Sequence, residues 1–226
     1  MIRAIVFDFD GVLADSEPLH LGAYQQVLSK FGVTLSREDY YANYLGYDDQ
    51  GVFAQLAARH GIELDDRGLR ALIDEKTRVF DATIESSINS GVILYPGAAT
   101  CVAVMASRYP LGIASGALRH EIEAILRGAQ LDRYFQFIVA SGETPAGKPA
   151  ADPYRRAAEL HAVPPSECLA IEDSRWGIES AKAAGLACVG LTTTYARRHL
   201  TAADRIIESL DELTPDLVDA LGREPR

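Results

Sequence analysis

The feature that most constrains the fold of this chain is a set of short apolar runs, rich in β-branched and aromatic residues, that alternate with helical patterns. The runs cover residues 3–9, 110–114, 135–140, 167–171 and 187–191. Between them, apolar residues recur at the three- and four-residue spacing of an amphipathic helix. Strands that alternate with helices form βαβ units, which build a parallel sheet covered on both faces. The sequence therefore predicts an α/β fold with a doubly wound parallel-sheet core.

One long segment interrupts this alternation, because residues 17–87 carry no strand pattern. Four apolar helical stripes follow one another in this segment, and Gly32 and Ser36 supply a stop and a start signal between the first two. We expect an inserted four-helix cap domain at 17–87. The α/β catalytic core domain would then consist of residues 1–16 and 88–226.

Near its end the chain carries a capping-box signature. Ser209 is followed three residues later by Glu212. The same segment contains three leucines, Leu210, Leu213 and Leu217. This pattern predicts the start of one last helix, docked by its leucines.

Charge and composition exclude some classes of partner. Lys and Arg total 22 against 32 for Asp and Glu, which gives a formal charge of -10 at pH 7. Nucleic acids and anionic membranes are bound mainly by positive charge, so we expect neither as a partner. No segment reaches the roughly 18 uncharged apolar residues that span a bilayer. The cysteines, Cys101, Cys168 and Cys188, lie in apolar stretches without metal-ligand spacing. We expect a cytoplasmic monomer or weak homodimer with buried, reduced cysteines.

Polar residues that can carry chemistry follow four of the predicted strands. Ligands of doubly wound sheets bind beyond the carboxyl ends of the strands, so these residues should converge at one edge. Clustered carboxylates repel one another unless a cation neutralises them, and their oxygens suit a hard ion such as Mg²⁺. A lysine, a hydroxyl and a backbone N–H would bind a phosphoryl group beside it. The pattern predicts phosphoryl transfer with Mg²⁺ as cofactor. The residues concerned are Asp8, Asp10, Ser115, Gly116, Lys148, Glu172 and Asp173.

Four motifs in this order resemble the haloacid dehalogenase superfamily. They are DFDGVLADS at 8–16, ASG at 114–116, GKPAADPY at 147–154 and IEDSRWG at 171–177. The four-helix insertion resembles that family's helical cap, found in members similar to phosphoglycolate phosphatase and beta-phosphoglucomutase. The resemblance covers residues 1–215 and implies a magnesium-dependent phosphatase that acts on a small phosphorylated metabolite.

The resemblance also implies a role for each site residue. Asp8 would be the nucleophile that becomes phosphorylated, and Asp10 the general acid and base. Ser115 and Lys148 would bind the phosphoryl group. A halide leaves without a proton whereas an alkoxide needs one, so the acid at position 10 favours phosphate esters as substrates. The expected metal-binding residues are Asp8, Asp10 through its carbonyl, Glu172 and Asp173.

The contacts with the rest of the substrate are less constrained by the sequence. His20 is also compatible with a solvated helix surface, and Glu172 with a strand-end acid paired with Arg175. The candidates for substrate binding are Glu17, His20, Gly46, Ser115 and Gly116.

Two other functions compete with a phosphatase. A sugar-phosphate mutase of the beta-phosphoglucomutase type must hold a second phosphate with a cation from its cap, whereas the segment at 45–49 offers Asp48 and Asp49. This departure favours a phosphatase. A phospho-acceptor signalling module of the receiver type is shorter, has no cap and carries its acceptor aspartate on the third strand. Here the third run ends in Ala140 and Ser141, which disfavours a receiver.

Overall fold

The structure is a computed structural model that describes residues 1–44, 47, 49–90 and 93–223. The chain divides into two compact units. Met1–Asp15 and Ser90–Arg226 form the first, which carries the sheet and is called the core unit below. Ser16–Asn89 form the second, which is called the helical unit.

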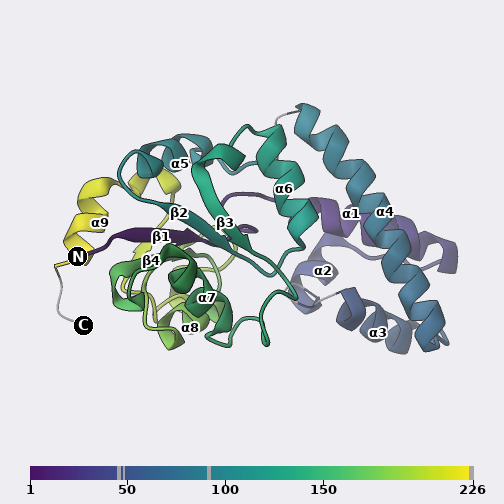
Figure 1. The fold of residues 1–226 in the computed structure, drawn as a ribbon. Helices are drawn as coiled ribbons and strands as arrows, with labels where there is room; N and C mark the ends of the chain where they lie inside the picture. The colour runs from purple at the N-terminus through teal and green to yellow at the C-terminus, as the bar shows by residue number, and fades with distance from the viewer. Residues whose placement is uncertain (45–46, 48, 91–92, 224–226) are drawn as a thin grey trace. The chain divides into compact units, whose positions relative to one another are not determined.

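Parallel strands form the sheet of the core unit, in the order β3-β2-β1-β4-β5-β6 (Figure 1). Strands β1, β2, β4 and β5 are buried along their whole length, as expected for strands with helices on both sides. The expected α/β fold with a parallel sheet is confirmed. The bounds are β1 Ala4–Phe7, β2 Leu111–Ala114, β3 Phe135–Val139, β4 Cys168–Glu172, β5 Ala187–Leu191 and β6 Arg205–Ile207.

Helices cover both faces of this sheet. In Figure 1, α5 (Ala98–Ala106), α6 (Arg119–Gly128) and α9 (Pro215–Leu221) lie on one side, and α7 (Asp152–His161) and α8 (Arg175–Ala183) on the other. Helix α7 packs against β2 and β3, and α8 against β4 and β5. The strand order reverses at β1, with β2 on one side of it and β4 on the other. Ligands of such sheets bind at this reversal, beyond the carboxyl end of β1.

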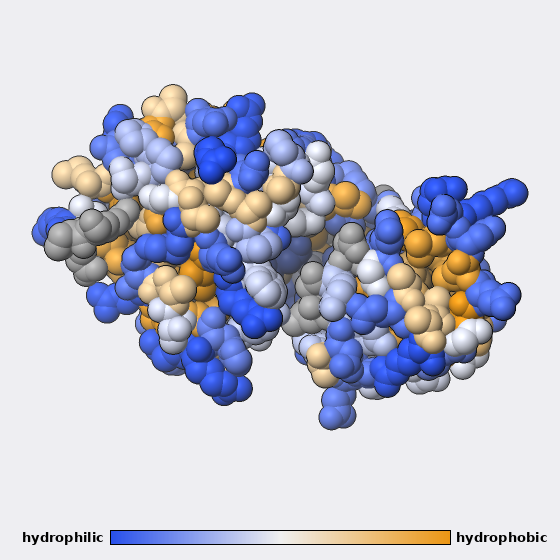
Figure 2. Space-filling model, turned by 90° about the horizontal axis from the view of Figure 1, so that it is seen from below, coloured by the Kyte–Doolittle hydropathy of each residue, from blue (hydrophilic) through white to orange (hydrophobic). Residues whose placement is uncertain are grey.

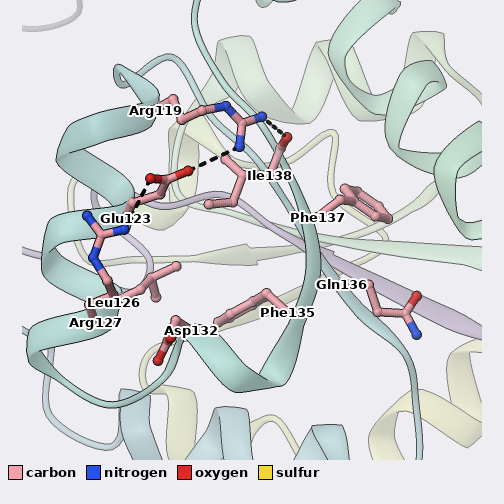
Figure 3. Close-up of a pocket in the computed structure, with 9 residues that line it drawn as sticks. All are labelled: Arg119, Glu123, Leu126, Arg127, Asp132, Phe135, Gln136, Phe137 and Ile138. Atoms are coloured by element: carbon pink, nitrogen blue, oxygen red, sulfur yellow. Dashed lines mark hydrogen bonds and ion pairs between the residues drawn. The ribbon is translucent and has the colours of Figure 1, made fainter.

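Strand β3 is an edge strand, and the structure protects its free edge. Leu111 pairs with Phe135 and Ile113 with Ile138, so β3 carries one extra residue as a bulge. The guanidinium of Arg119 donates to the carbonyl of Ile138 at 2.7 Å. Figure 3 shows this contact across the hollow between α6 and β3. A bulge and a charged side chain on an edge both disfavour pairing with another chain.

The helical unit has its own apolar core. Its helices are α1 (Glu17–Leu28), α2 (Arg37–Asn43), α3 (Asp49–His60) and α4 (Asp66–Ser90), and all four contribute buried side chains to that core. Gly32 adopts a left-handed conformation, with φ of 67°, after the short 3-10 turn that follows α1. Ser36 caps α2 by accepting a hydrogen bond from the backbone N–H of Asp39.

The prediction of a helix starting at Ser209 was wrong. The capping box of Ser209 and Glu212 is present, but it encloses a single 3-10 turn. Helix α9 begins at Pro215 and is capped by Thr214, whose side chain accepts from the backbone N–H of Leu217 at 3.2 Å. The residue before a proline is disfavoured in helical conformation, and a proline suits the first helical position. A helix from Ser209 therefore stops before Thr214, and a new one starts after it.

The surface and the cysteines bear on the remaining expectations. On the face seen in Figure 2, hydrophilic residues cover most of the surface and apolar residues lie in separate patches between them. Within the described ranges, no helix combines the length and the apolar character needed to cross a membrane. All three cysteines are buried and none forms a disulfide, so the expectation that they are buried is confirmed.

His161, at the end of α7, should make stability depend on pH. The ring is partly buried and packs edge-on against Phe137, with the ring centroids 4.5 Å apart. Burial lowers the pKa of His161, and the nearby backbone of Ile5 offsets this only in part. As pH falls through about 6.5, the usual value, the unfolded chain therefore takes up this proton before the folded chain does. The free energy of unfolding should fall between pH 7 and pH 5.

The test compares His161→Phe with His60→Phe, a change at an exposed histidine of the helical unit. Urea unfolding at pH 5, 6 and 7 should show a smaller loss of stability for His161→Phe than for the wild type. His60→Phe should keep the wild-type slope. An unchanged slope in His161→Phe would contradict the assignment.

Candidate active site

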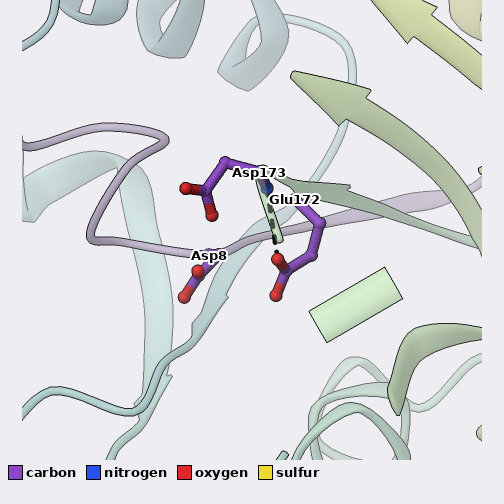
Figure 4. A group of neighbouring side chains, drawn as sticks. All are labelled: Asp8, Glu172 and Asp173. Carbon is purple, nitrogen blue, oxygen red and sulfur yellow. Dashed lines mark hydrogen bonds between the residues drawn. The ribbon is translucent and has the colours of Figure 1, made fainter. Parts of the chain in front are cut away.

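Three acidic side chains meet at the carboxyl ends of β1 and β4, which are neighbours in the sheet. Asp8 follows β1, Glu172 ends β4, and Asp173 comes next. All three are buried, and one carboxylate oxygen from each lies within 4.8 Å of the others (Figure 4). Burial of so much negative charge needs compensation by cations or by hydrogen-bond donors.

Lys148, in the loop before α7, supplies part of this compensation. Its Nζ lies 2.8 Å from Oδ1 of Asp8 and 2.6 Å from Oε1 of Glu172. Burial alone would lower the pKa of Lys148, but the two carboxylates outweigh burial and raise it, so the side chain stays charged. One lysine still leaves the cluster with more negative than positive charge.

The negative charge that Lys148 does not neutralise lies on Asp8 and Asp173. Burial raises the pKa of Asp8 to about 6, against the opposing effect of Lys148. Burial, and then the charges of Glu172 and Asp8, raise the pKa of Asp173 well above its usual value. Among the described residues, Oδ1 of Asp8 has the shared ammonium of Lys148 at 2.8 Å and no neutral hydrogen-bond donor. A buried carboxylate that shares its lysine with Glu172 and lies beside a second carboxylate is a fitting site for a hard divalent cation.

Glu172 is used differently from its two neighbours. Its Oε1 accepts from Nζ of Lys148 and, at 2.9 Å, from the hydroxyl of Tyr154. Its Oε2 accepts from the backbone N–H of Asp173 and from both the backbone N–H and the hydroxyl of Ser174, at 3.1 to 3.2 Å. Five donors already contact this carboxylate, so it is suited to orienting Lys148, and the direct metal contact predicted for Glu172 stays a prediction.

Neighbouring residues give Glu172 its place. A Cβ on Gly177 would lie 1.7 Å from the Glu172 carboxylate, so only glycine leaves room for that side chain under α8. The alternative pairing of Glu172 with Arg175 was wrong, because the Arg175 guanidinium stacks on the ring of Trp176 at 4.1 Å. Lys148 and Tyr154 reach Glu172 instead, since its side chain is fully buried and Arg175 is exposed.

The turn after β1 approaches Asp173 closely. Gly11 has φ of +78°, and a Cβ there would come within 2.0 Å of Oδ2 of Asp173. The hydroxyl of Thr193, after β5, donates to the carbonyl of Gly11. Thr194 hydrogen-bonds the carboxylate of Asp173. Neither threonine was predicted as a site residue, because in the sequence a run of three threonines indicates only a polar loop. Asp10, next to Gly11, is partly buried, and the metal contact predicted for its carbonyl stays a prediction.

Ser115 and Gly116 follow β2, the other neighbour of β1 in the sheet. Ser115 is buried, its backbone N–H donates to the carbonyl of Val139 at 2.9 Å, and its Oγ accepts from the backbone N–H of Ala117 at 3.1 Å. Gly116 is exposed, with open space where a Cβ would stand. A hydroxyl that accepts one bond can still donate its own proton to a ligand oxygen.

The candidates Glu17 and His20 lie on α1 in the helical unit. Glu17 accepts a hydrogen bond from the hydroxyl of Tyr40 at 2.7 Å. The ring of His20 stacks on Phe80, with centroids 4.0 Å apart. His20 is therefore partly buried against Phe80 rather than fully solvated on the helix surface. Gly46, the third candidate of this part of the chain, lies outside the described residues.

A buried lysine that was not predicted stands beside His20. Lys76 on α4 is 2% exposed, and its Nζ lies 2.8 Å from Nδ1 of His20 and 2.9 Å from Asp49. Burial, and then the charge of Lys76, lower the pKa of His20, so the neutral ring accepts at Nδ1 and carries its proton on Nε2. A sequence signal did exist, because Lys76 stands four residues from both Leu72 and Phe80 in the apolar stripe of its helix.

Comparison with known proteins assigns the family. A family model described as haloacid dehalogenase-like hydrolase matches residues 2–185, a range that includes Asp8, Asp10, Ser115, Gly116, Lys148, Glu172 and Asp173. The chain belongs to the haloacid dehalogenase-like hydrolase family. The resemblance inferred from the four motifs is thereby confirmed.

Relatives match this hydrolase over most of its length. Protein CbbY from Rhodobacter capsulatus is 31% identical and aligns with 97% of this chain and 99% of its own. Fructose-1-phosphate phosphatase YqaB from Escherichia coli strain K12 is 30% identical, over 82% of this chain and 94% of its own. A solved structure of a CbbY variant from Rhodobacter sphaeroides with xylulose-(1,5)bisphosphate superposes with a TM-score of 0.81, at 28% identity, over 94% of this chain and 96% of that one.

Proposed function

We propose that this hydrolase is a magnesium-dependent phosphatase that hydrolyses a small phosphorylated metabolite through a phosphoaspartate on Asp8. The observation that carries the proposal is the buried pair of carboxylates, Asp8 and Asp173, held beside Lys148 at the strand-order reversal. The named phosphatases among the relatives confirm the reaction class, phosphoric monoester hydrolysis.

The chemistry of the first step follows from Asp8 and Asp10. A carboxylate oxygen of Asp8 attacks phosphorus, and the bond from phosphorus to the ester oxygen breaks. The leaving alcohol takes a proton from Asp10, which becomes a carboxylate. In the second step that carboxylate takes a proton from water, whose oxygen attacks the phosphoaspartate and releases inorganic phosphate. Asp8 and Asp10 both return to their starting states.

Other residues of the core unit bind and stabilise the phosphoryl group. Lys148 offsets the charge that builds up on its oxygens, and the Ser115 hydroxyl and the Gly116 N–H donate to them. Asp8, Asp173 and the carbonyl of Asp10 would hold Mg²⁺, with Glu172 acting through Lys148. When bound, this ion would neutralise the clustered carboxylates and the phosphoryl oxygens.

A phosphatase fits the helical unit better than a mutase does. A mutase needs a spare cation for a second phosphate, whereas the charge of Lys76 is already neutralised by Asp49. Asp49 also accepts a hydrogen bond from the hydroxyl of Tyr24. Asp48 lies outside the described residues. A phospho-acceptor signalling module is disfavoured because the candidate acceptor, Asp8, follows the first strand, and because the family is one of hydrolases.

We expect monophosphates to be better substrates than matched bisphosphates, without isomerisation of hexose phosphates. Asp49→Arg introduces a cation and also removes the ion-pair partner of buried Lys76, so thermal unfolding must first show that the variant is folded. In the folded variant, kcat/KM for the bisphosphate relative to the monophosphate should rise by about tenfold, the effect of about 1.4 kcal/mol of added attraction. The measurement is kcat/KM for a matched monophosphate and bisphosphate, with Mg²⁺, in the wild type and in the variant.

The matched control is Asp74→Arg, the same change of charge at an exposed position of α4. It should leave the ratio unchanged. A preference for bisphosphates is the outcome to test against, because a CbbY structure contains a bound bisphosphate. A wild type that prefers the bisphosphate would overturn this substrate class, and one that interconverts hexose phosphates would overturn the choice of phosphatase over mutase.

The remaining assignments form part of the same proposal. Residues 17–87 would serve as the cap domain that selects the substrate, through Glu17, His20 and Gly46, and residues 1–16 with 88–226 as the catalytic domain. The protein would work in the cytoplasm as a monomer or weak homodimer. A screen of phosphorylated sugars and small phosphorylated acids with Mg²⁺, read by phosphate release, would identify the substrate.

A further inference from the structure

Tyr154 is an aromatic residue that contacts the charged cluster described above. It lies on α7, fully buried, and its hydroxyl donates to Oε1 of Glu172 at 2.9 Å. The same oxygen accepts from Nζ of Lys148 at 2.6 Å, and that Nζ also lies 2.8 Å from Oδ1 of Asp8. The ring of Tyr154 flanks the ammonium, whose nitrogen is 5.1 Å from the ring centroid.

The position of Lys148 depends on a competition between two carboxylates. Glu172 and Asp8 both attract its ammonium, and only the share left to Asp8 serves the nucleophile and the phosphoryl group. Glu172 itself cannot move away, because three donors hold its Oε2 and Gly177 shapes the space around it. The strength with which Glu172 attracts Lys148 therefore depends on Oε1, which accepts from Lys148 and Tyr154.

We propose that Tyr154 is a positioning residue, whose hydroxyl shares Oε1 of Glu172 with Lys148 and so keeps the ammonium available to Asp8 and to the phosphoryl group. A neutral donor reduces the pull of a carboxylate on a nearby cation without adding positive charge. Without this hydroxyl, Oε1 would have Lys148 as its single partner. The lysine would then be drawn toward Glu172. This inference rests on the proposed phosphatase function.

The test is Tyr154→Phe, which removes one oxygen and keeps the ring. Its matched control is Tyr109→Phe in the same unit, which removes a tyrosine hydroxyl bonded to Asp219 at 3.0 Å. With Mg²⁺ and an aryl phosphate, kcat of Tyr154→Phe should fall about tenfold, the effect of losing one hydrogen bond to a charged group. KM should change less than kcat, because Lys148 acts most strongly on charge that develops during transfer. Tyr109→Phe should keep the wild-type kcat.

Two further measurements separate positioning from a structural role. The loss in Tyr154→Phe should be the same for aryl and alkyl phosphates, because Lys148 does not act on the leaving group. In a Glu172→Gln background, which weakens the pull on Lys148, Tyr154→Phe should have no further effect on kcat, because the tyrosine acts through that carboxylate. Thermal unfolding with and without Mg²⁺ should show the same metal-induced shift in Tyr154→Phe as in the wild type.

The outcomes are distinct. A wild type without phosphatase activity would overturn the proposed function. An active wild type with equal kcat in Tyr154→Phe and Tyr109→Phe would overturn the role of Tyr154 alone. So would a loss confined to KM, a loss of the Mg²⁺ shift, additive effects with Glu172→Gln, or a Tyr154→Phe protein that does not fold.

Discussion

Asp8→Asn is expected to lower phosphatase turnover by at least about four orders of magnitude while the protein stays folded. The amide keeps the shape of the side chain but cannot form the acyl phosphate, because it lacks an anionic oxygen. The variant also removes one of three buried negative charges, so the fold should not be weakened by charge repulsion. The measurements are hydrolysis of an aryl phosphate with Mg²⁺ and thermal unfolding.

The matched control is Asp132→Asn, the same chemical change at an exposed position in a 3-10 turn of the core unit. It should retain wild-type turnover. If Asp8→Asn keeps appreciable turnover with Mg²⁺, Asp8 is not the nucleophile. If it loses activity only because it unfolds at the assay temperature, the effect does not concern attack on phosphorus, and a lower unfolding temperature would reveal this.

Most of the sheet could be predicted from the sequence because a strand buried on both faces leaves a continuous apolar run. Strands β1, β2, β4 and β5 have this character, and each was expected within a few residues of its bounds. Strand β6, at Arg205–Ile207, was not predicted, because three residues at a half-exposed edge are too few to show an alternation of apolar and polar side chains. The helix start near Ser209 was misplaced because a capping box also closes a single turn.

The parts of the candidate site differ in how visible they are in the sequence. Asp8, Lys148 and Asp173 follow strands or stand in a recognisable motif, so a parallel sheet brings them to one edge. The hydrogen bond from Tyr154 to Glu172 was invisible, because in the sequence Tyr154 is one more large residue of an apolar stripe. Only side-chain packing shows which way its hydroxyl points. The burial of Lys76 could not be predicted for a related reason, because a lysine is rarely buried without a charged partner, and its partner Asp49 is visible only in the packed structure.

Asp173→Asn is expected to lower activity by about a thousandfold or more and, at the same time, to stabilise the metal-free protein. Neutralisation of the clustered charge by a metal is worth several kcal/mol to the reaction, and the variant loses a metal-binding carboxylate. The stability effect has the opposite sign. Burial and neighbouring charges raise the pKa of Asp173, so in the metal-free protein its ionisation is disfavoured by folding. The unfolded chain loses this proton first as pH rises through about 4, and the folded state is then destabilised relative to it.

Two readouts should therefore diverge. At pH 8 without metal, the unfolding temperature of Asp173→Asn should exceed that of the wild type by about 2–4 °C, the effect of about 1 kcal/mol in a chain of this size. At pH 4 the difference should shrink, because the wild-type carboxyl is then protonated in the folded state. Addition of Mg²⁺ should raise the unfolding temperature of the wild type and leave that of the variant nearly unchanged.

Trp176 gives an independent reading of the same event. It is the only tryptophan of the sequence, it is 43% exposed, and it stands three residues after Asp173 at the start of α8. Titration with Mg²⁺ should change its fluorescence in the wild type and in Asp132→Asn, but not in Asp173→Asn. A metal-free Asp173→Asn protein that is less stable than the wild type at pH 8 would show that the carboxylate is satisfied by its protein partners alone. A metal cation binds where the protein leaves negative charge uncompensated. If Asp173→Asn is less stable without metal and still responds to Mg²⁺, Asp173 is therefore not a metal-binding residue.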